Sequence, residues 1–181
     1  MNNEFSKLKG NDGISFVRTR RTRSSSALRN LVRENRLNPE NFVYPFFVVE
    51  GEGIKQEIPS MPGQFQLSVD KLVEDCFEVT ECKIPAIILF GIPDKKDDRA
   101  TQAYSETGII QIATKAIKEK FPELCVITDV CLCEYMDHGH CGVVEDNKIV
   151  NDPTLELLSQ TALSHVVAGA DMVAPSDMMD G

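Results

Sequence analysis

The chain has 181 residues and a mass of 20.1 kDa, with 42% of its residues hydrophobic and 26% charged. These values are typical of one globular domain and exclude a disordered, collagen-like or fibrous protein. The longest apolar run, at 42–49, is far shorter than the roughly 18 residues that a membrane span needs, and no export signal is visible before it. We therefore expect a cytoplasmic protein that does not bind membranes.

The formal charge of -9 is divided unevenly along the chain. Residues 1–36 contain nine Lys or Arg and three Asp or Glu residues, whereas residues 37–181 contain ten Lys or Arg and twenty-five Asp or Glu residues. An acidic body repels a phosphate backbone, so the arginines near position 20 do not predict nucleic-acid binding. We expect a basic N-terminal arm at 1–36, whose charge attracts the acidic body of a neighbouring subunit, and a folded body at 37–181.

Short apolar segments alternate with amphipathic ones along the body. Within the arm, a short helix is possible near 27–32. Apolar runs bounded by Gly and Pro predict buried strands at 42–49, 86–90, 125–132 and 171–174. Segments with a 3.6-residue period predict helices that begin after Ser68, run from 109 to about 121, and extend from 152 to 169. The charged segment 94–99 is either a solvated surface loop or a mobile lid.

Alternation of strands and helices predicts an α/β fold with a parallel sheet. An open doubly wound sheet and a (β/α)8 barrel both satisfy this order. Eight units at the spacing of these strands need roughly 330 residues, which lies within the range of such barrels. In a TIM barrel, the four strands present would belong to the first half, preceded by the extended arm, whereas an open sheet could be complete in 181 residues; both architectures remain open at this point.

The third strand carries the residues most suited to chemistry. Because side chains alternate along a strand, Asp129, Cys131 and Cys133 are expected on one face, and the loop at 134–140 can return Cys141 to them. Three thiolates suit zinc and leave a fourth position open, as in catalytic zinc sites. The alternative is that these cysteines are merely buried or incidental.

The remaining cysteines and histidines carry weaker signals. Cys76, Cys82 and Cys125 lie in apolar or helical segments, where cysteine commonly serves as a small hydrophobic residue. His138 and His140 flank the cysteine group and are candidates for metal ligands, for loop-orienting residues or for exposed side chains. His165 lies in a predicted helix among apolar residues, so a structural role is expected.

Several segments resemble one enzyme family. The run TDVCLCEYMDHGHCG at 128–142 closely resembles the metal-binding segment of the porphobilinogen synthase (5-aminolevulinate dehydratase) family. GADMVAPSDMMDG at 169–181 resembles that family's fourth strand, and YPFFV at 44–48 and IPSMPG at 58–63 resemble its first strand and following loop. The resemblance extends from about residue 18 to residue 181.

The resemblance implies a TIM barrel that condenses two molecules of 5-aminolevulinate to porphobilinogen in tetrapyrrole synthesis. It implies Zn²⁺ at Cys131, Cys133 and Cys141, because the magnesium-dependent members carry carboxylates in place of these cysteines. It also implies that Asp129 and Ser176 lie in the active site, that any additional Mg²⁺ site lies beyond residue 181, and that the arm at 1–36 wraps a neighbour in a homo-oligomer, usually an octamer.

Two alternatives to this function are considered. The family's two active-site lysines, one of which forms a Schiff base with substrate, come from the second half of the barrel, and the lysines present here lie in loops, helices or the arm. The 181 residues alone are therefore expected to be inactive, and a catalytically silent zinc-binding or interaction fragment is the first alternative. The second is an open-sheet hydrolase with Cys131 as nucleophile and His138 as base.

Overall fold

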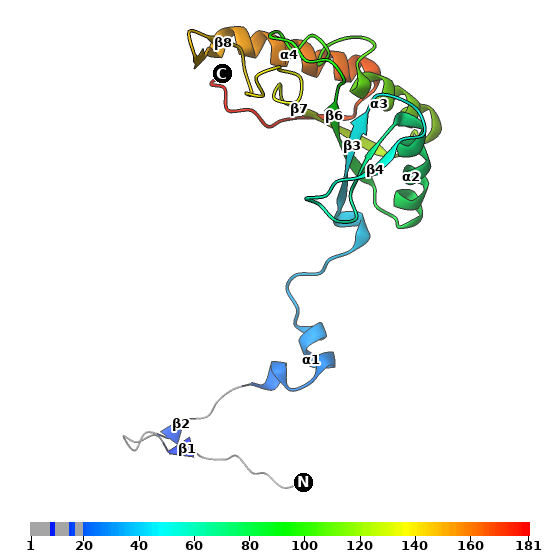
Figure 1. The fold of residues 1–181 in the computed structure, drawn as a ribbon. Coiled ribbons are helices and arrows are strands. Elements are labelled where there is room, and N and C mark those ends of the chain that lie inside the picture. Colours follow the sequence, from blue (N-terminus) through cyan, green and yellow to red (C-terminus); the bar gives the residue numbers. More distant parts are fainter. Residues whose placement is uncertain (1–7, 10–14, 17–19) are drawn as a thin grey trace. The chain divides into compact units, whose positions relative to one another are not determined.

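The computed structural model describes residues 8–9, 15–16 and 20–181, and the chain divides into two compact units, residues 1–37 and 38–181. In the first unit, β1 (Leu8–Lys9) pairs with β2 (Ser15–Phe16), and a 3-10 turn, η1 (Arg21–Arg23), precedes the helix α1 (Ser26–Leu31) (Figure 1). The Ser25 side chain caps α1 by accepting a hydrogen bond from the Leu28 N–H at 3.2 Å. The helix predicted at 27–32 is therefore present, but it begins and ends one residue earlier in the sequence.

The second unit is built on a six-stranded sheet of order β10-β7-β6-β3-β5-β4 (Figure 1). A 3-10 turn, η2 (Pro39–Asn41), leads into the first of its strands. The strands are β3 (Val43–Val49), β4 (Lys55–Glu57), β5 (Phe65–Leu67), β6 (Ala86–Ile92), β7 (Cys125–Val130) and β10 (Met172–Pro175). All neighbours are parallel except the pair β4 and β5. The predicted α/β fold with a parallel sheet is confirmed.

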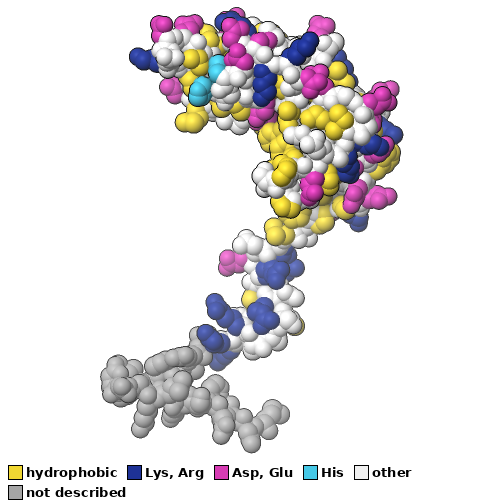
Figure 2. Space-filling view, in the orientation of Figure 1, with side chains coloured by type: hydrophobic (Ala, Val, Ile, Leu, Met, Phe, Trp, Pro, Cys, Tyr) yellow, Lys and Arg dark blue, Asp and Glu magenta, His cyan; other side chains and the backbone are white. Residues whose placement is uncertain are grey.

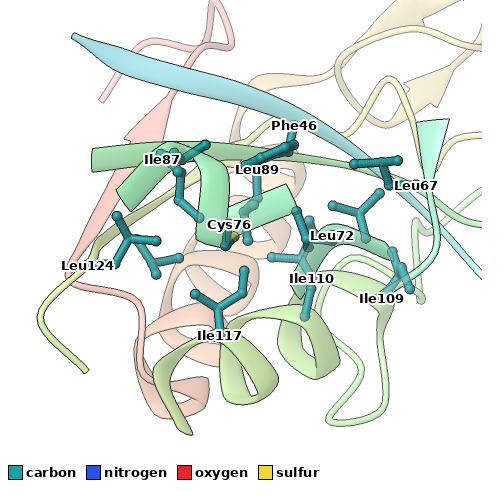
Figure 3. Close-up of a cluster of buried hydrophobic side chains, with 14 residues drawn as sticks. Phe46, Leu67, Leu72, Cys76, Ile87, Leu89, Ile109, Ile110, Ile117 and Leu124 are labelled. Carbon is teal, nitrogen blue, oxygen red and sulfur yellow. The ribbon is translucent and has the colours of Figure 1, made fainter. Parts of the chain in front are cut away.

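Three helices pack against this sheet: α2 (Val69–Glu81), α3 (Ile109–Lys120) and α4 (Asn151–Ala168). Figure 3 shows the larger core, in which Leu72 and Cys76 of α2 and Ile110 and Ile117 of α3 cluster with Leu89 of the sheet. A second cluster lies under α4 and includes Leu157 and Leu158 with residues of the loop after β7. These two clusters fix the positions of the strand ends.

Alternation along the strands separates the two faces of the sheet. Phe46, Leu89 and Val126 are buried on the face that contacts the helices. Their neighbours along the strands, such as Phe47 and Phe90, remain partly exposed, and these two rings stack with centroids 5.4 Å apart. Parallel sheets usually bury both faces, so the second face offers apolar surface for further packing.

The four predicted main strands and three main helices are all present. The third strand ends at Val130 rather than at 132, so Cys131 and Cys133 lie in the loop that follows it. The short strands β4 and β5 and the hairpin of β8 (Val144–Glu145) and β9 (Lys148–Ile149) were not predicted. Among the described residues, no helix is both long and apolar enough to span a bilayer.

Charge is distributed differently over the two units. Figure 2 shows Lys and Arg side chains concentrated on the described part of the first unit, and Asp and Glu spread over the visible face of the second. The helical turns η1 and α1 contain no buried side chain, and Leu31 is 74% exposed. Within residues 20–37, the arm therefore has no apolar core of its own.

Candidate metal centre

The candidate centre lies at the carboxyl end of β7, where the chain leaves the sheet. Val130 and Leu132 are buried under α4, and this packing directs the intervening Cys131 to the other side of the chain. Cys131 is itself buried, while Cys133 and Cys141 are half-buried. The strand ends before Cys131, but the packing of Val130 and Leu132 still separates Cys131 from these apolar neighbours, as strand alternation predicted.

The three thiols come together as predicted. The sulfur atoms of Cys131, Cys133 and Cys141 all lie within 4.8 Å of one another, and the Sγ atoms of Cys131 and Cys133 are 3.3 Å apart. A tetrahedral zinc ion with Zn–S bonds near 2.3 Å requires sulfur atoms about 3.8 Å apart. Only small side-chain adjustments separate this arrangement from three zinc ligands, so the donor set fits zinc.

The surroundings of Cys131 and Cys133 favour the neutral thiol. Burial raises the pKa of Cys131, hydrogen bonds with Cys133 oppose this effect, and the Cys141 side chain adds to it. Burial also raises the pKa of Cys133, whose Sγ donates a hydrogen bond to Glu134 Oε2 at 2.9 Å. Thiolates become favourable here only when a cation supplies positive charge, so metal binding must release protons.

A carboxylate and a hydroxyl lie together at the ends of two adjacent strands. Ser176, just after β10, donates a hydrogen bond from Oγ to Asp129 Oδ1 at 2.7 Å. Burial raises the pKa of Asp129, Glu134 and Asp177 add to this effect, and the Ser176 hydrogen bond opposes it. The predicted pair is therefore assembled, and its carboxyl group holds a proton more readily than an exposed aspartate does.

The histidines lie apart from the thiol cluster. His138 and His140 are exposed, with ring centroids 5.4 Å apart, and the His140 N–H donates to His138 Nδ1 at 3.1 Å. Within residues 20–181, the one group of three or more potential metal ligands contains the cysteines and neither histidine. His165 is buried in α4, as expected of a structural residue.

The other cysteines and the lysines lie elsewhere in the fold. Cys76 belongs to the main core, where burial raises its pKa to about 12, and Cys82 is exposed at the end of α2. In the part of the chain from residue 20 onward, none of the strands β3, β6, β7 and β10 carries a lysine. These four strands therefore provide no lysine side chain that could form an imine with substrate.

Sequence reasoning missed the residues that support the loop between Cys133 and Cys141. Tyr135 and Met136 are buried in the cluster under α4, and Asp97 pairs with their main chain from the loop after β6. The apolar pair Tyr-Met between polar neighbours was a signal that this loop packs inward. The loop that contains Asp97 carries no such pattern, because it contacts the cysteine loop through main-chain groups.

Comparison with known proteins gives one consistent result. The family model of delta-aminolevulinic acid dehydratase matches residues 16–181. The relative from Halalkalibacterium halodurans is 54% identical over 168 residues, which cover 93% of this chain and 51% of that protein. The relative from Bacillus subtilis is 54% identical over 167 residues, which cover 92% and 52%.

A solved structure agrees with these sequence matches. The crystal structure of the Toxoplasma gondii ME49 delta-aminolevulinic acid dehydratase, in complex with the reaction product porphobilinogen, is 41% identical with a TM-score of 0.88. The match covers 96% of this chain and 51% of that one, so the chain spans about half the length of the relatives it matches. The chain belongs to the delta-aminolevulinic acid dehydratase family.

Proposed function

We propose that this chain is the N-terminal portion of a zinc-dependent porphobilinogen synthase, a lyase that condenses two molecules of 5-aminolevulinate to porphobilinogen with loss of water. The observation that carries the proposal is the cluster of three thiols beside Asp129 and Ser176, at the carboxyl ends of parallel strands. This is the edge at which α/β barrels and open α/β sheets assemble their active sites. The match to a family structure solved with porphobilinogen supports the same substrate class.

The metal that best fits the thiols is zinc. Cys131, Cys133 and Cys141 supply three soft ligands, whereas magnesium and calcium prefer oxygen. A zinc ion held by these three residues would supply Lewis-acid chemistry for a substrate oxygen or amine. The raised pKa values of Cys131 and Cys133 mean that these thiols give up their protons as the ion binds.

Asp129 and Ser176 are proposed to act directly on substrate. In the metal-free protein, burial and the nearby Glu134 raise the pKa of the Asp129 carboxyl group. Such a group can accept and return a proton during condensation. The hydroxyl of Ser176 occupies Asp129 Oδ1, so the second carboxyl oxygen is the one available for that transfer.

The full protein is proposed to be a (β/α)8 barrel. The parallel order of β10, β7, β6 and β3, with α2, α3 and α4 contacting the sheet, supports three consecutive βα units of such a barrel and the strand of a fourth. The partly exposed second face of the sheet would line its interior. The imine-forming lysines and any additional Mg²⁺ site are assigned to sequence beyond Gly181.

Residues 1–36 are proposed to be an oligomerisation arm of a cytoplasmic homo-oligomer, which family resemblance suggests is an octamer. The exposed apolar side chains Leu28, Leu31 and Val32 on the arm support this, because they need a partner surface. The segregation of positive charge on the arm and negative charge on the body adds attraction between subunits. No nucleic-acid or membrane partner is proposed.

The function is tested by measuring porphobilinogen formation from 5-aminolevulinate with the full-length protein. Activity should disappear after treatment with a chelator and return with Zn²⁺ but not with Mg²⁺ alone. Cys133→Ala should remain inactive at every zinc concentration. The matched change Cys82→Ala, at an exposed cysteine distant in sequence from the thiol cluster, should leave activity intact. Full activity in chelated protein would contradict the proposed role of zinc, and no product under any condition would contradict the proposed reaction.

The alternative of a catalytically silent zinc-binding fragment is favoured by one observation, which is the absence of lysine from the four main strands in residues 20–181. It applies to the 181 residues taken alone. The two possibilities differ in whether substrate becomes covalently attached to a lysine.

A further inference from the structure

The loop after β6 contacts the loop that carries the cysteines. The Asp97 N–H donates to the Tyr135 carbonyl at 3.2 Å, and the Asp137 N–H donates to the Asp97 carbonyl at 3.2 Å. Both main-chain groups of Asp97 therefore pair with residues on either side of Met136, in a parallel bridge. These bonds fall in the segment between Cys133 and Cys141, at the midpoint of the turn that brings the third thiol back.

The side chain of Asp97 fixes the shape of its own loop. Its carboxylate accepts hydrogen bonds from the Arg99 N–H at 2.9 Å, from the Thr101 N–H at 3.0 Å and from the Thr101 hydroxyl. Burial alone would raise the pKa of Asp97, but these hydrogen bonds lower it, so the carboxylate is charged at neutral pH. Within this turn, Ala100 is fully buried with a φ of 49°, a conformation that L-residues adopt only when their surroundings impose it.

The cysteine loop is also held from its other side. Tyr135 and Met136 are buried, and the Tyr135 hydroxyl occupies the space where a Cβ at position 91 would lie. Gly91 on β6 therefore permits the ring to lie against the strand. The loop is thus held by side-chain packing below and by the main chain of Asp97 beside it.

Holding this loop matters for the thiols. Cys141 is separated from Cys133 by seven residues, including Gly139 at a φ of 74°, and it joins the cluster only if that segment turns back. Ordering a flexible loop of this length during metal binding costs conformational entropy and weakens affinity. A loop already held in the metal-free protein avoids most of this cost.

We propose that Asp97 is a positioning residue for the metal centre, because its carboxylate shapes the loop whose main chain holds the segment between Cys133 and Cys141. The proposal rests on the proposed metal-binding function. It assigns to the charged segment 94–99 a fixed supporting role, in place of either a mobile lid or a merely solvated loop.

The test compares Asp97→Ala with Asp98→Ala in the full-length protein, since Asp98 is an exposed aspartate at the next position. Zinc affinity is measured by competition with a chromophoric chelator, and Co²⁺ is added as a spectroscopic probe of thiolate ligation. We expect the zinc dissociation constant to rise about tenfold in Asp97→Ala, in line with other residues that support metal ligands, and to stay unchanged in Asp98→Ala. Asp97→Asn, which retains one acceptor oxygen, should restore part of the affinity.

A second readout does not depend on zinc. Amide hydrogen exchange of residues 134–140 in the metal-free protein should be faster in Asp97→Ala than in Asp98→Ala. If Asp97→Ala does not fold, Thr101→Val removes one hydrogen bond to the same carboxylate and is measured in its place. Equal zinc affinity in the paired variants overturns the proposal. If the wild-type protein binds no zinc, the proposed metal centre is wrong, and unchanged exchange at 134–140 then overturns the positioning role separately.

Discussion

His165 is a buried base whose protonation should weaken the fold. The ring is 1% exposed in α4, and burial lowers its pKa from 6.5 to about 4, with the Ala103 carbonyl opposing the shift. The unfolded chain therefore binds a proton between pH 6.5 and 4 that the folded protein excludes, and the free energy of unfolding falls as the pH falls through this window. The shift corresponds to a loss of up to about 3 kcal/mol, which is absent above pH 6.5.

Chemical denaturation of the wild type and of His165→Gln between pH 7.5 and 4 tests this prediction. Carboxyl groups titrate in the same range, but they do so in both proteins, so the difference between the two curves isolates His165. We expect the stability of the variant to depend less on pH by about 3 kcal/mol across the window. Parallel curves would show that His165 is not the buried neutral base described here.

At the scale of single elements, α2 ends in an arrangement that normally favours glycine. The Lys83 N–H donates to the Thr80 carbonyl and the Ile84 N–H to the Val79 carbonyl, which is the hydrogen-bond pattern of a Schellman motif. Lys83 adopts the left-handed conformation that this motif requires, with a φ of 60°. An exposed lysine carries the steric cost of that conformation, which glycine does not.

Lys83→Gly is therefore expected to stabilise the protein by about 1 kcal/mol, after the greater freedom of glycine in the unfolded chain is subtracted. Lys83→Ala serves as the control, because it removes the charge and keeps the Cβ, and it should give no such gain. The measurement is the midpoint of denaturant-induced unfolding for the three proteins. A loss of stability in Lys83→Gly would mean that the lysine side chain makes a favourable contact.

The main elements could be predicted because each depends on a local pattern. The 3.6-residue period at 109–120 predicts a helix that buries one face. The apolar run at 43–49 predicts a strand inside a sheet. The strands β4 and β5 were missed because each has three residues, and their pairing depends on β3 lying alongside. Short strands take their conformation from a neighbour, which a local pattern does not reveal.

The candidate site was predictable to the same extent. Cys131, Cys133, Cys141 and Asp129 lie close together in sequence, so one strand and one loop bring them together. The placement of Ser176 in the same site as Asp129 followed only from a family resemblance, because their hydrogen bond depends on the β7–β10 register. The contact of Asp97 with the cysteine loop was not predicted, since it involves main-chain groups of two loops.

At the scale of the whole molecule, the first prediction concerns assembly. Deleting residues 1–36 from the full-length protein should lower the particle mass in analytical ultracentrifugation, from a large homo-oligomer towards a dimer or monomer. Exposed ion pairs contribute only about 0.2–1 kcal/mol each, so burial of apolar residues such as Leu28 and Leu31 must supply most of the association energy. Replacing both leucines with serine should have the same effect as the deletion. An unchanged mass in both cases would show that the arm has another role.

The second prediction concerns the covalent chemistry of the 181 residues alone. Incubation with 5-aminolevulinate and borohydride should leave no adduct on any lysine, because the four main strands of the described chain carry none. Intact-mass spectrometry reads out the result. The full-length protein, treated in the same way, should gain the mass of one reduced substrate adduct. An adduct on the 181-residue chain would show that one of its own lysines forms the imine.

The central claim is that the three thiols at the end of β7 hold one zinc ion, and the most direct test is the metal content of purified full-length protein. The account predicts close to one tightly bound zinc per chain in the wild type and in Cys82→Ala, and a large loss of zinc in Cys133→Ala, Cys131→Ala and Cys141→Ala. Retention of wild-type zinc by Cys133→Ala, with its fold intact by circular dichroism, would contradict the claim.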